Sequence, residues 1–144
     1  MIKQISVFLE NKPGSLAAFA KELQKNDIDL RALSLAETES FGIARLITDD
    51  AMATVNALKD AGYICSLTNV VAVELEDRPG ALINILDALG ENNINLEYTY
   101  AFLAKKAGSA ILALRVLDGE AAERVLGEHN IKPLSQDDLP ALFG

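Results

Sequence analysis

The chain contains an internal repeat. A shift of 66 positions lays residues 11–30 over residues 77–96 without a gap. Seven of these twenty positions are identical, beginning with the Pro-Gly pairs at 13–14 and 79–80, whereas ordinary residue usage gives about one identity. Two copies of one structural unit therefore make up most of the chain.

The repeat predicts the domain organisation. The alignment continues to Gly42/Gly108, after which the second copy carries two extra residues. We expect one domain at residues 1–67, a second at residues 68–134, and a short C-terminal tail at residues 135–144. The joint between the copies is too short to act as a flexible linker, so we expect the two domains to pack side by side.

Both copies show the same order of strand and helix patterns. Apolar residues alternate at 5–9 and 71–75, which predicts strands, and the segments after each Pro-Gly pair carry an apolar stripe at helical spacing. Two strands, a helix and a short strand follow in each copy. The expected ranges are 31–38, 43–48, a helix capped by Asp50, and a strand at 63–65 in copy one, and 97–104, 109–116, a helix capped by Asp118, and a strand near Ile131 in copy two.

This order predicts an α+β fold. Each copy reads βαββαβ, the ferredoxin-like arrangement in which two helices cover one face of a four-stranded antiparallel sheet. Because edge strands of such sheets invite pairing, we expect the two sheets to be continuous and the chain to form a homodimer.

Composition and charge exclude several classes of function. The chain has 13 basic and 21 acidic residues, a formal charge of −8, so its average field repels nucleic acid and anionic membranes. Cys65 and His129 are the sole residues of their types and cannot form a structural zinc site, and we expect neither a metal nor a cofactor. No signal peptide or membrane span is found, and we expect a cytoplasmic protein.

Ferredoxin-like units serve many functions, so the loops must decide between them. The third strands carry no aromatic residue for stacking RNA bases, and the first loop lacks the paired cysteines of a metal carrier. An acylphosphatase-like hydrolase needs an arginine in that loop, and copy two has Arg78 where copy one has Lys12. No nucleophile and base are found together, so we predict a protein that is not an enzyme, with this hydrolase as one alternative.

The segment that runs from the strand through (Asn/Asp)-x-Pro-Gly-x-Leu to Asn-(Asp/Asn)-Ile-(Asp/Asn)-Leu resembles the ACT domain, and it occurs twice in register. The chain is therefore similar to stand-alone tandem ACT proteins. The resemblance implies a non-catalytic regulatory protein that binds a free amino acid or similar small metabolite at ACT domain interfaces and acts on a partner enzyme or regulator. A protein–protein interaction module without a ligand is the other alternative.

The first loops have the chemistry to hold a carboxylate. Glycine permits the backbone to turn into a helix whose first amides and positive end favour an anion. The resemblance also suggests that polar flanking residues bind the ammonium group. The candidate ligand-binding residues are Asn11, Pro13, Gly14, Ser15, Leu16 and Asp29 in copy one, and Asp77, Pro79, Gly80, Ala81, Leu82 and Asn95 in copy two. Pro-Gly before a helix is also common punctuation without any ligand.

Tyr98, Tyr100 and Phe102 alternate along one strand of copy two, where copy one has small residues. Alternation places the three rings on one face of the strand. We expect them to serve packing or a dimer face rather than to bind a ligand.

Overall fold

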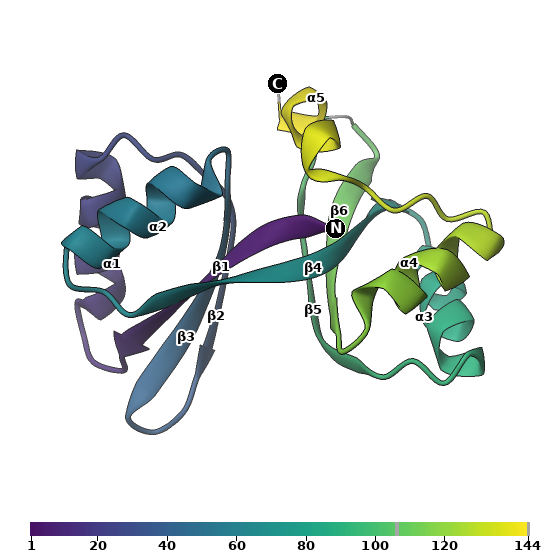
Figure 1. Ribbon diagram of the computed structural model, residues 1–144, viewed down its shortest axis with the longest axis horizontal. Coiled ribbons are helices and arrows are strands. Elements are labelled where there is room, and N and C mark those ends of the chain that lie inside the picture. Colours follow the sequence, from purple (N-terminus) through teal and green to yellow (C-terminus); the bar gives the residue numbers. More distant parts are fainter. Residues whose placement is uncertain (106, 144) are drawn as a thin grey trace. The chain divides into compact units, whose positions relative to one another are not determined.

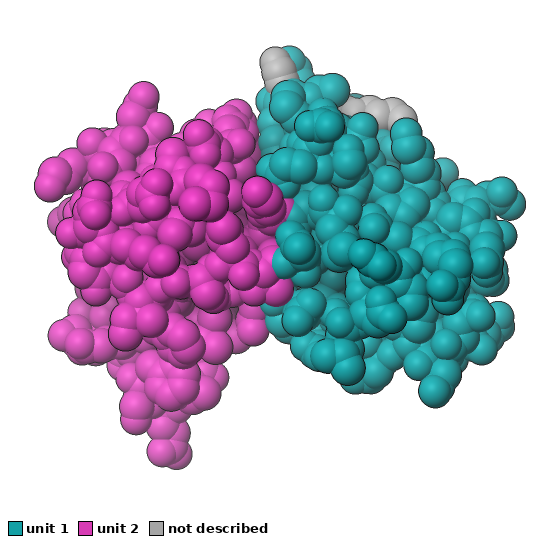
Figure 2. All heavy atoms as spheres, in the orientation of Figure 1, with its two compact units in different colours: residues 1–2, 69–144 teal, residues 3–68 magenta. Residues whose placement is uncertain are grey.

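The computed structural model describes residues 1–105 and 107–143 (Figure 1). Gly144 of the expected tail lies outside the described residues. The chain divides into two compact units, which are coloured separately in Figure 2. The N-terminal unit is residues 3–68, and the C-terminal unit is residues 1–2 together with 69–144. Within the described ranges, no helix is long and apolar enough to cross a membrane.

The N-terminal unit has the expected order of elements. They are β1 (Ile2–Glu10), α1 (Ser15–Lys25), β2 (Leu30–Glu37), β3 (Phe41–Thr48), α2 (Ala51–Asp60) and the start of β4 (Cys65–Glu76). The strand order is β2-β3-β1 with antiparallel pairing, and the Phe8 amide donates to the Ile64 carbonyl at 3.0 Å beside the start of β4. Both helices lie on one face of this sheet (Figure 1), so the ferredoxin-like prediction is confirmed.

The core of the N-terminal unit follows from the two sequence periods. Alternate residues of β1 (Ile5, Val7 and Leu9) point to the helices, and Phe19 and Leu23 of α1 face them. All five are buried, and residues of α2 and β3 complete the cluster. The stripe on α1 is fixed against the sheet by this burial, because isolated helices of this length are marginal in water.

The C-terminal unit repeats the plan with one difference. It contains the rest of β4, α3 (Ala81–Glu91), β5 (Leu96–Leu103), β6 (Ser109–Val116), α4 (Gly119–Glu128), the 3-10 turn η1 (Gln136–Asp138) and α5 (Leu139–Phe143), with strand order β4-β6-β5. The short strand expected near Ile131 is reduced to an isolated bridge between Val73 and Pro133, with the Leu134 amide donating to the Ala72 carbonyl at 2.7 Å. Proline has no amide hydrogen, so the ladder does not extend through it.

The C-terminal segment folds onto its own unit. Ser135 and Asp138 form a capping box, whose hydrogen bonds from the Ser135 amide and hydroxyl hold the pKa of the Asp138 carboxyl below its usual value. Leu139 is buried, and the Phe143 ring lies 6.1 Å from that of Phe102. Residues 135–143 of the expected tail are thus packed, and Phe143 lies against Phe102, one of the three aromatic residues that alternate along β5.

Leu139→Ala tests whether this segment contributes to stability. The substitution removes a buried leucine side chain, and we expect it to lower the free energy of unfolding by about 2 kcal/mol, the lower end of the usual range for such truncations. Leu103→Ala, at an exposed leucine of β5, is the control and should be near neutral. Urea unfolding of both variants measures the difference, and equal midpoints would show that the segment is not packed in solution.

Candidate functional site

The Pro-Gly loops adopt the same backbone turn in both units. Gly14 has φ 86° and Gly80 has φ 84°, both in the left-handed region that favours glycine. The following amides close the loops, from Ser15 to the Lys12 carbonyl at 3.2 Å and from Ala81 to the Arg78 carbonyl at 3.3 Å. The recurrence of this turn explains why the Pro-Gly pair is the most evident feature of the repeat.

The helices that follow these loops begin without a side-chain cap. Neither α1 nor α3 has a side-chain cap or an acidic residue in its first turn. By contrast, the Asp50 carboxylate accepts from the Ala53 amide at 3.0 Å in α2, and the Asp118 carboxylate accepts from the Ala121 amide at 3.1 Å in α4. The confirmed caps neutralise the start of α2 and α4, whereas α1 and α3 keep a positive end that suits an external carboxylate.

A hollow of about 590 Å³ lies beside the first loop in the N-terminal unit. Its lining residues are Phe8, Leu9, Glu10, Lys12, Pro13, Gly14, Ser15, Ala18, Phe41, Gly62, Tyr63 and Ile64. The candidate residues Pro13, Gly14 and Ser15 therefore meet there. Leu16 packs against the core, and the Asn11 side-chain amide donates to the Thr38 carbonyl at 2.9 Å, which ties the loop to the β2–β3 hairpin.

Asp29 lies at the other end of α1 from Gly14. It lines a separate hollow of about 420 Å³ with Gln24 and Asp27, and α1 spans about 16 Å at 1.5 Å per residue. Its carboxylate lies 3.4 Å from the Arg31 guanidinium. Within this unit, the structure thus does not bring Asp29 to the loop.

The segments that lead to Asp29 and Asn95 also have a structural role. Asp27 and Asn93 take left-handed conformations after α1 and α3, and the Ile28 and Ile94 amides donate to helix carbonyls, both at 2.9 Å. Such left-handed residues end helices. Asn95 is exposed just before β5 and lines none of the hollows described here.

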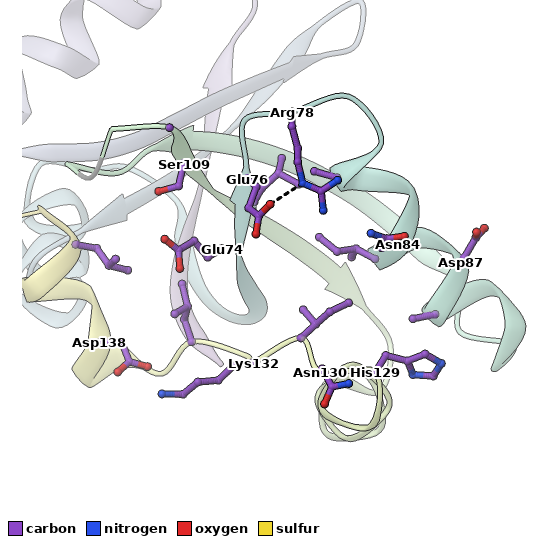
Figure 3. A pocket seen from close by; sticks show the side chains of 18 of the residues that line it. Glu74, Glu76, Arg78, Asn84, Asp87, Ser109, His129, Asn130, Lys132 and Asp138 are labelled. Atoms are coloured by element: carbon purple, nitrogen blue, oxygen red, sulfur yellow. Dashed lines mark hydrogen bonds and ion pairs between the residues drawn. The ribbon is translucent and has the colours of Figure 1, made fainter.

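The C-terminal unit has two hollows near its loop. One, of about 550 Å³, brings together Asp77, Gly80, Ala81 and Leu82 with the β5–β6 hairpin. The other, of about 1010 Å³, lies between β4, α3 and the segment from 129 to 142 (Figure 3). Most residues of the hollow beside Gly14 have their aligned counterparts in this larger hollow, whereas Gly80 and Ala107, the counterparts of Gly14 and Phe41, line the smaller one.

The basic residue of each loop is paired with a glutamate two positions earlier. The Lys12 ammonium lies 2.8 Å from Glu10, and the Arg78 guanidinium lies 2.6 Å from Glu76, as drawn in Figure 3. The Lys12 hydrogen bond and charge lower the pKa of the Glu10 carboxyl. A hydrolase of acyl phosphates would need an arginine directed at its anion, and here that arginine is bound to Glu76.

The single histidine and cysteine have structural surroundings. His129 Nδ1 lies 2.8 Å from the Val125 carbonyl at the end of α4. Burial raises the pKa of the Cys65 thiol, which opposes formation of a reactive thiolate. In the part of the chain that the structure describes, no group of three or more His, Cys, Asp or Glu side chains could hold a metal ion.

The sequence patterns did not predict the large apolar residues that line the first hollow. Phe8, Phe41, Tyr63 and Ile64 line the first hollow but come from three separate stretches of the sequence. A comparison of the two aligned copies could have pointed to Phe8, because its counterpart is Glu74, a change from an aromatic ring to a carboxylate.

The repeated unit, its sheet and its loops define an ACT domain pair. The ACT domain pair family matches residues 1–143, and the chain belongs to this family. The identification rests on nearly the whole length of the chain.

Solved structures agree with the family assignment. Protein BT0572 from Bacteroides thetaiotaomicron is 36% identical, with 96% of this chain and 94% of that chain covered and a TM-score of 0.87. The ligand-free regulatory subunit of aspartate kinase from Thermus thermophilus shares the fold at 17% identity, with 88% and 91% of the two chains covered and a TM-score of 0.64. The corresponding subunit from Thermus flavus has 16% identity, 89% and 92% coverage and a TM-score of 0.61. Among curated proteins, no match is found.

Gly14→Ala tests the left-handed turn. An added Cβ would meet no atom within 4 Å, so the expected loss of about 1–2 kcal/mol in the free energy of unfolding comes from the backbone conformation alone. Gly90→Ala, in α3 and also in open space, is the matched control and should raise stability by up to about 1 kcal/mol. Thermal or urea unfolding measures both changes, and a shift in the same direction would contradict the prediction.

Asp49→Asn tests the ion pair beside Asp29. The Arg31 guanidinium donates to both Asp49 oxygens, at 2.9 and 2.8 Å, and lowers the pKa of the Asp49 carboxyl. A depressed folded-state pKa means that the pair stabilises the fold above about pH 4, the unfolded value, and that the contribution disappears as the pH falls through the folded-state value. Since both side chains are partly exposed, we expect a loss of about 0.2–1 kcal/mol at neutral pH.

Urea titrations of wild type and Asp49→Asn at neutral and strongly acidic pH measure this difference. The two proteins should converge in stability in acid. A stability difference that is the same at both pH values would contradict the ion-pair explanation.

Proposed function

We propose that the protein is a non-catalytic regulator that binds a free amino acid, or a similar small zwitterion, beside its Pro-Gly loops. The observation that carries the proposal is a contrast between the helices. α1 and α3 begin without a side-chain cap, each next to a hollow, whereas α2 and α4 are capped by aspartate. Membership of the ACT domain pair family supports a regulatory role. The proteins named above as regulatory subunits of aspartate kinase have the same fold.

The ligand carboxylate accepts hydrogen bonds from the first-turn amides after Gly14 or Gly80. Its ammonium group needs an oxygen, and the side chains of Asn11 and Asp77, three positions before the loop glycines, each carry one. Asp29 cannot join Asn11 within one unit, because α1 separates them. We infer that Asp29 and Asn95 reach the ligand from another ACT domain, so that the complete site lies at a domain interface and a homodimer is the form that binds.

Regulation follows from the location of the site at an interface. A ligand shared by two domains stabilises the arrangement in which both sets of residues contact it, and it shifts the equilibrium by the difference in its affinity for the two arrangements. The output passes to a partner enzyme or regulator in the cytoplasm. No catalytic step is assigned to the chain.

A panel of the common amino acids tests the proposed function. We expect at least one of them to raise the melting temperature, since a ligand at 100 times its dissociation constant stabilises by about 2.7 kcal/mol. Calorimetric titration of Gly14→Asp and Gly80→Asp should show loss of binding in at least one variant, because the new carboxylate opposes that of the ligand.

Gly14→Asn and Gly80→Asn are the matched controls. Asparagine and aspartate tolerate left-handed conformations to a similar degree, so the Asp-to-Asn difference isolates the charge. Binding that survives both aspartate variants would place the ligand elsewhere. A complete absence of amino-acid binding would favour the alternative of an interaction module without a ligand.

A further inference from the structure

The hollow beside Gly14 and the larger hollow of the C-terminal unit differ in the chemistry of their walls. Counterparts are related by 66 positions up to Gly42 and by 68 positions afterwards. Two large apolar residues of the first hollow therefore have charged counterparts that line the larger hollow of the C-terminal unit. The pairs are Phe8 with Glu74 and Ile64 with Lys132. The counterpart of Phe41 is Ala107, which lines the smaller hollow together with Gly80.

The apolar residues of the first hollow form a continuous and exposed wall. The rings of Phe8 and Phe41 are 5.9 Å apart and tilted by 53°. The register pairs Phe8 with Ile43 and Glu10 with Phe41, so both rings project from the same face of the sheet, which is opposite to the face that packs against α1 and α2. Ile64 stands beside Phe8 across the hydrogen bond between β1 and the start of β4. Their exposed fractions are 48% for Phe8, 42% for Phe41 and 71% for Ile64.

The rest of the first hollow is suited to a small amphipathic anion. Glu10 and Lys12 neutralise each other, so the wall has no net charge. Ala18 and Leu9 add further apolar surface, and Gly14 and Ser15, at the uncapped start of α1, line the hollow from the helix side of the sheet. The volume of about 590 Å³ is in the range of small-molecule sites.

The larger hollow of the C-terminal unit has the opposite character. Five carboxylates line it, from Glu74, Glu76, Asp87, Glu91 and Asp138, against the two cations Arg78 and Lys132. Figure 3 shows Glu74 and Glu76 on β4, Asp87 on α3 and Asp138 on the C-terminal segment. An apolar ligand group placed there would displace water from charged groups without replacing their hydrogen bonds, which is unfavourable.

We propose that the hollow beside Gly14 selects a carboxylate with an apolar, ring-sized side chain, and that the larger hollow of the C-terminal unit rejects such a ligand. The inference rests on the proposed function and specifies its ligand class for one of the two copies. A ring is favoured because aromatic pairs are stabilised in tilted arrangements at centroid separations of about 4.5–7 Å. The Phe8 and Phe41 side chains are exposed, so a ligand ring can form such pairs with them.

The test uses L-phenylalanine as the probe and exchanges wall residues between the copies. Phe8→Glu with Ile64→Lys gives the first hollow the residues of the larger hollow of the C-terminal unit. We expect the dissociation constant for L-phenylalanine to rise at least tenfold. Glu74→Phe with Lys132→Ile makes the reverse exchange, and we expect the calorimetric stoichiometry to increase from one to two ligands per chain.

Met52→Glu is the matched control. Met52 is 49% exposed on α2 and lies outside the hollow, so this variant adds a charge at an exposed apolar residue and should bind L-phenylalanine as wild type does. Circular dichroism of each variant establishes that it is folded. The reverse exchange keeps the test decisive if Phe8→Glu disrupts β1.

The outcomes separate this inference from the proposed function. Binding of polar amino acids but not L-phenylalanine, or loss of L-phenylalanine binding in Gly80→Asp alone, overturns the inference and leaves the proposed function standing. Unchanged affinity in the Phe8→Glu and Ile64→Lys double variant also overturns the inference. If no amino acid binds to the wild type, both the inference and the proposed function fail.

Discussion

The left-handed turn at Gly14 and Gly80 is the local constraint on which each unit depends. A side chain at φ near 85° is strained, and glycine removes that strain, so the strand can reverse into a helix within a few residues. The short reversal brings Phe19 and Leu23 of α1 over alternate residues of β1 and so forms the core of the N-terminal unit. The same reversal leaves a hollow where the strand ends and the helix begins.

Two ways of starting a helix occur in each unit, and the difference links stability to binding. Asp50 and Asp118 cap their helices with a carboxylate that belongs to the chain, an interaction typically worth about 1 kcal/mol. The helices after Gly14 and Gly80 lack this stabilisation. A ligand carboxylate at these positions would therefore replace an interaction that the fold itself provides elsewhere, and part of its binding free energy would appear as added stability of the helix.

Sequence patterns predict the repeat, the order of elements and the α+β class, because each follows from short periods that local residues satisfy. The fourth strand of the C-terminal unit is not predictable in this way, because Pro133 leaves a single bridge where the pattern indicates a strand. The packing of residues 135–143 depends on contacts of Leu139 and Phe143 with distant residues, and a segment this short has no helical period of its own. The position of Asp29 at the far end of α1 is a consequence of helix length rather than of residue type. The hollow walls are harder still to predict, since Phe8, Phe41 and Ile64 meet only after the sheet has formed.

Duplication followed by divergence explains why one chain would keep two copies of the same loop. The backbone turn is retained in both units, whereas the walls differ from apolar and neutral beside Gly14 to strongly charged in the larger hollow of the C-terminal unit. Two identical hollows would report one metabolite twice, but two hollows with different walls can report two metabolites to one partner. If both ligands favour the same arrangement of domains, linkage requires each to raise the affinity for the other by the same factor. A two-input regulator of the proposed kind would need different walls and the same turn, because in that proposal the turn holds the group common to all amino acids and the walls hold the group that distinguishes them.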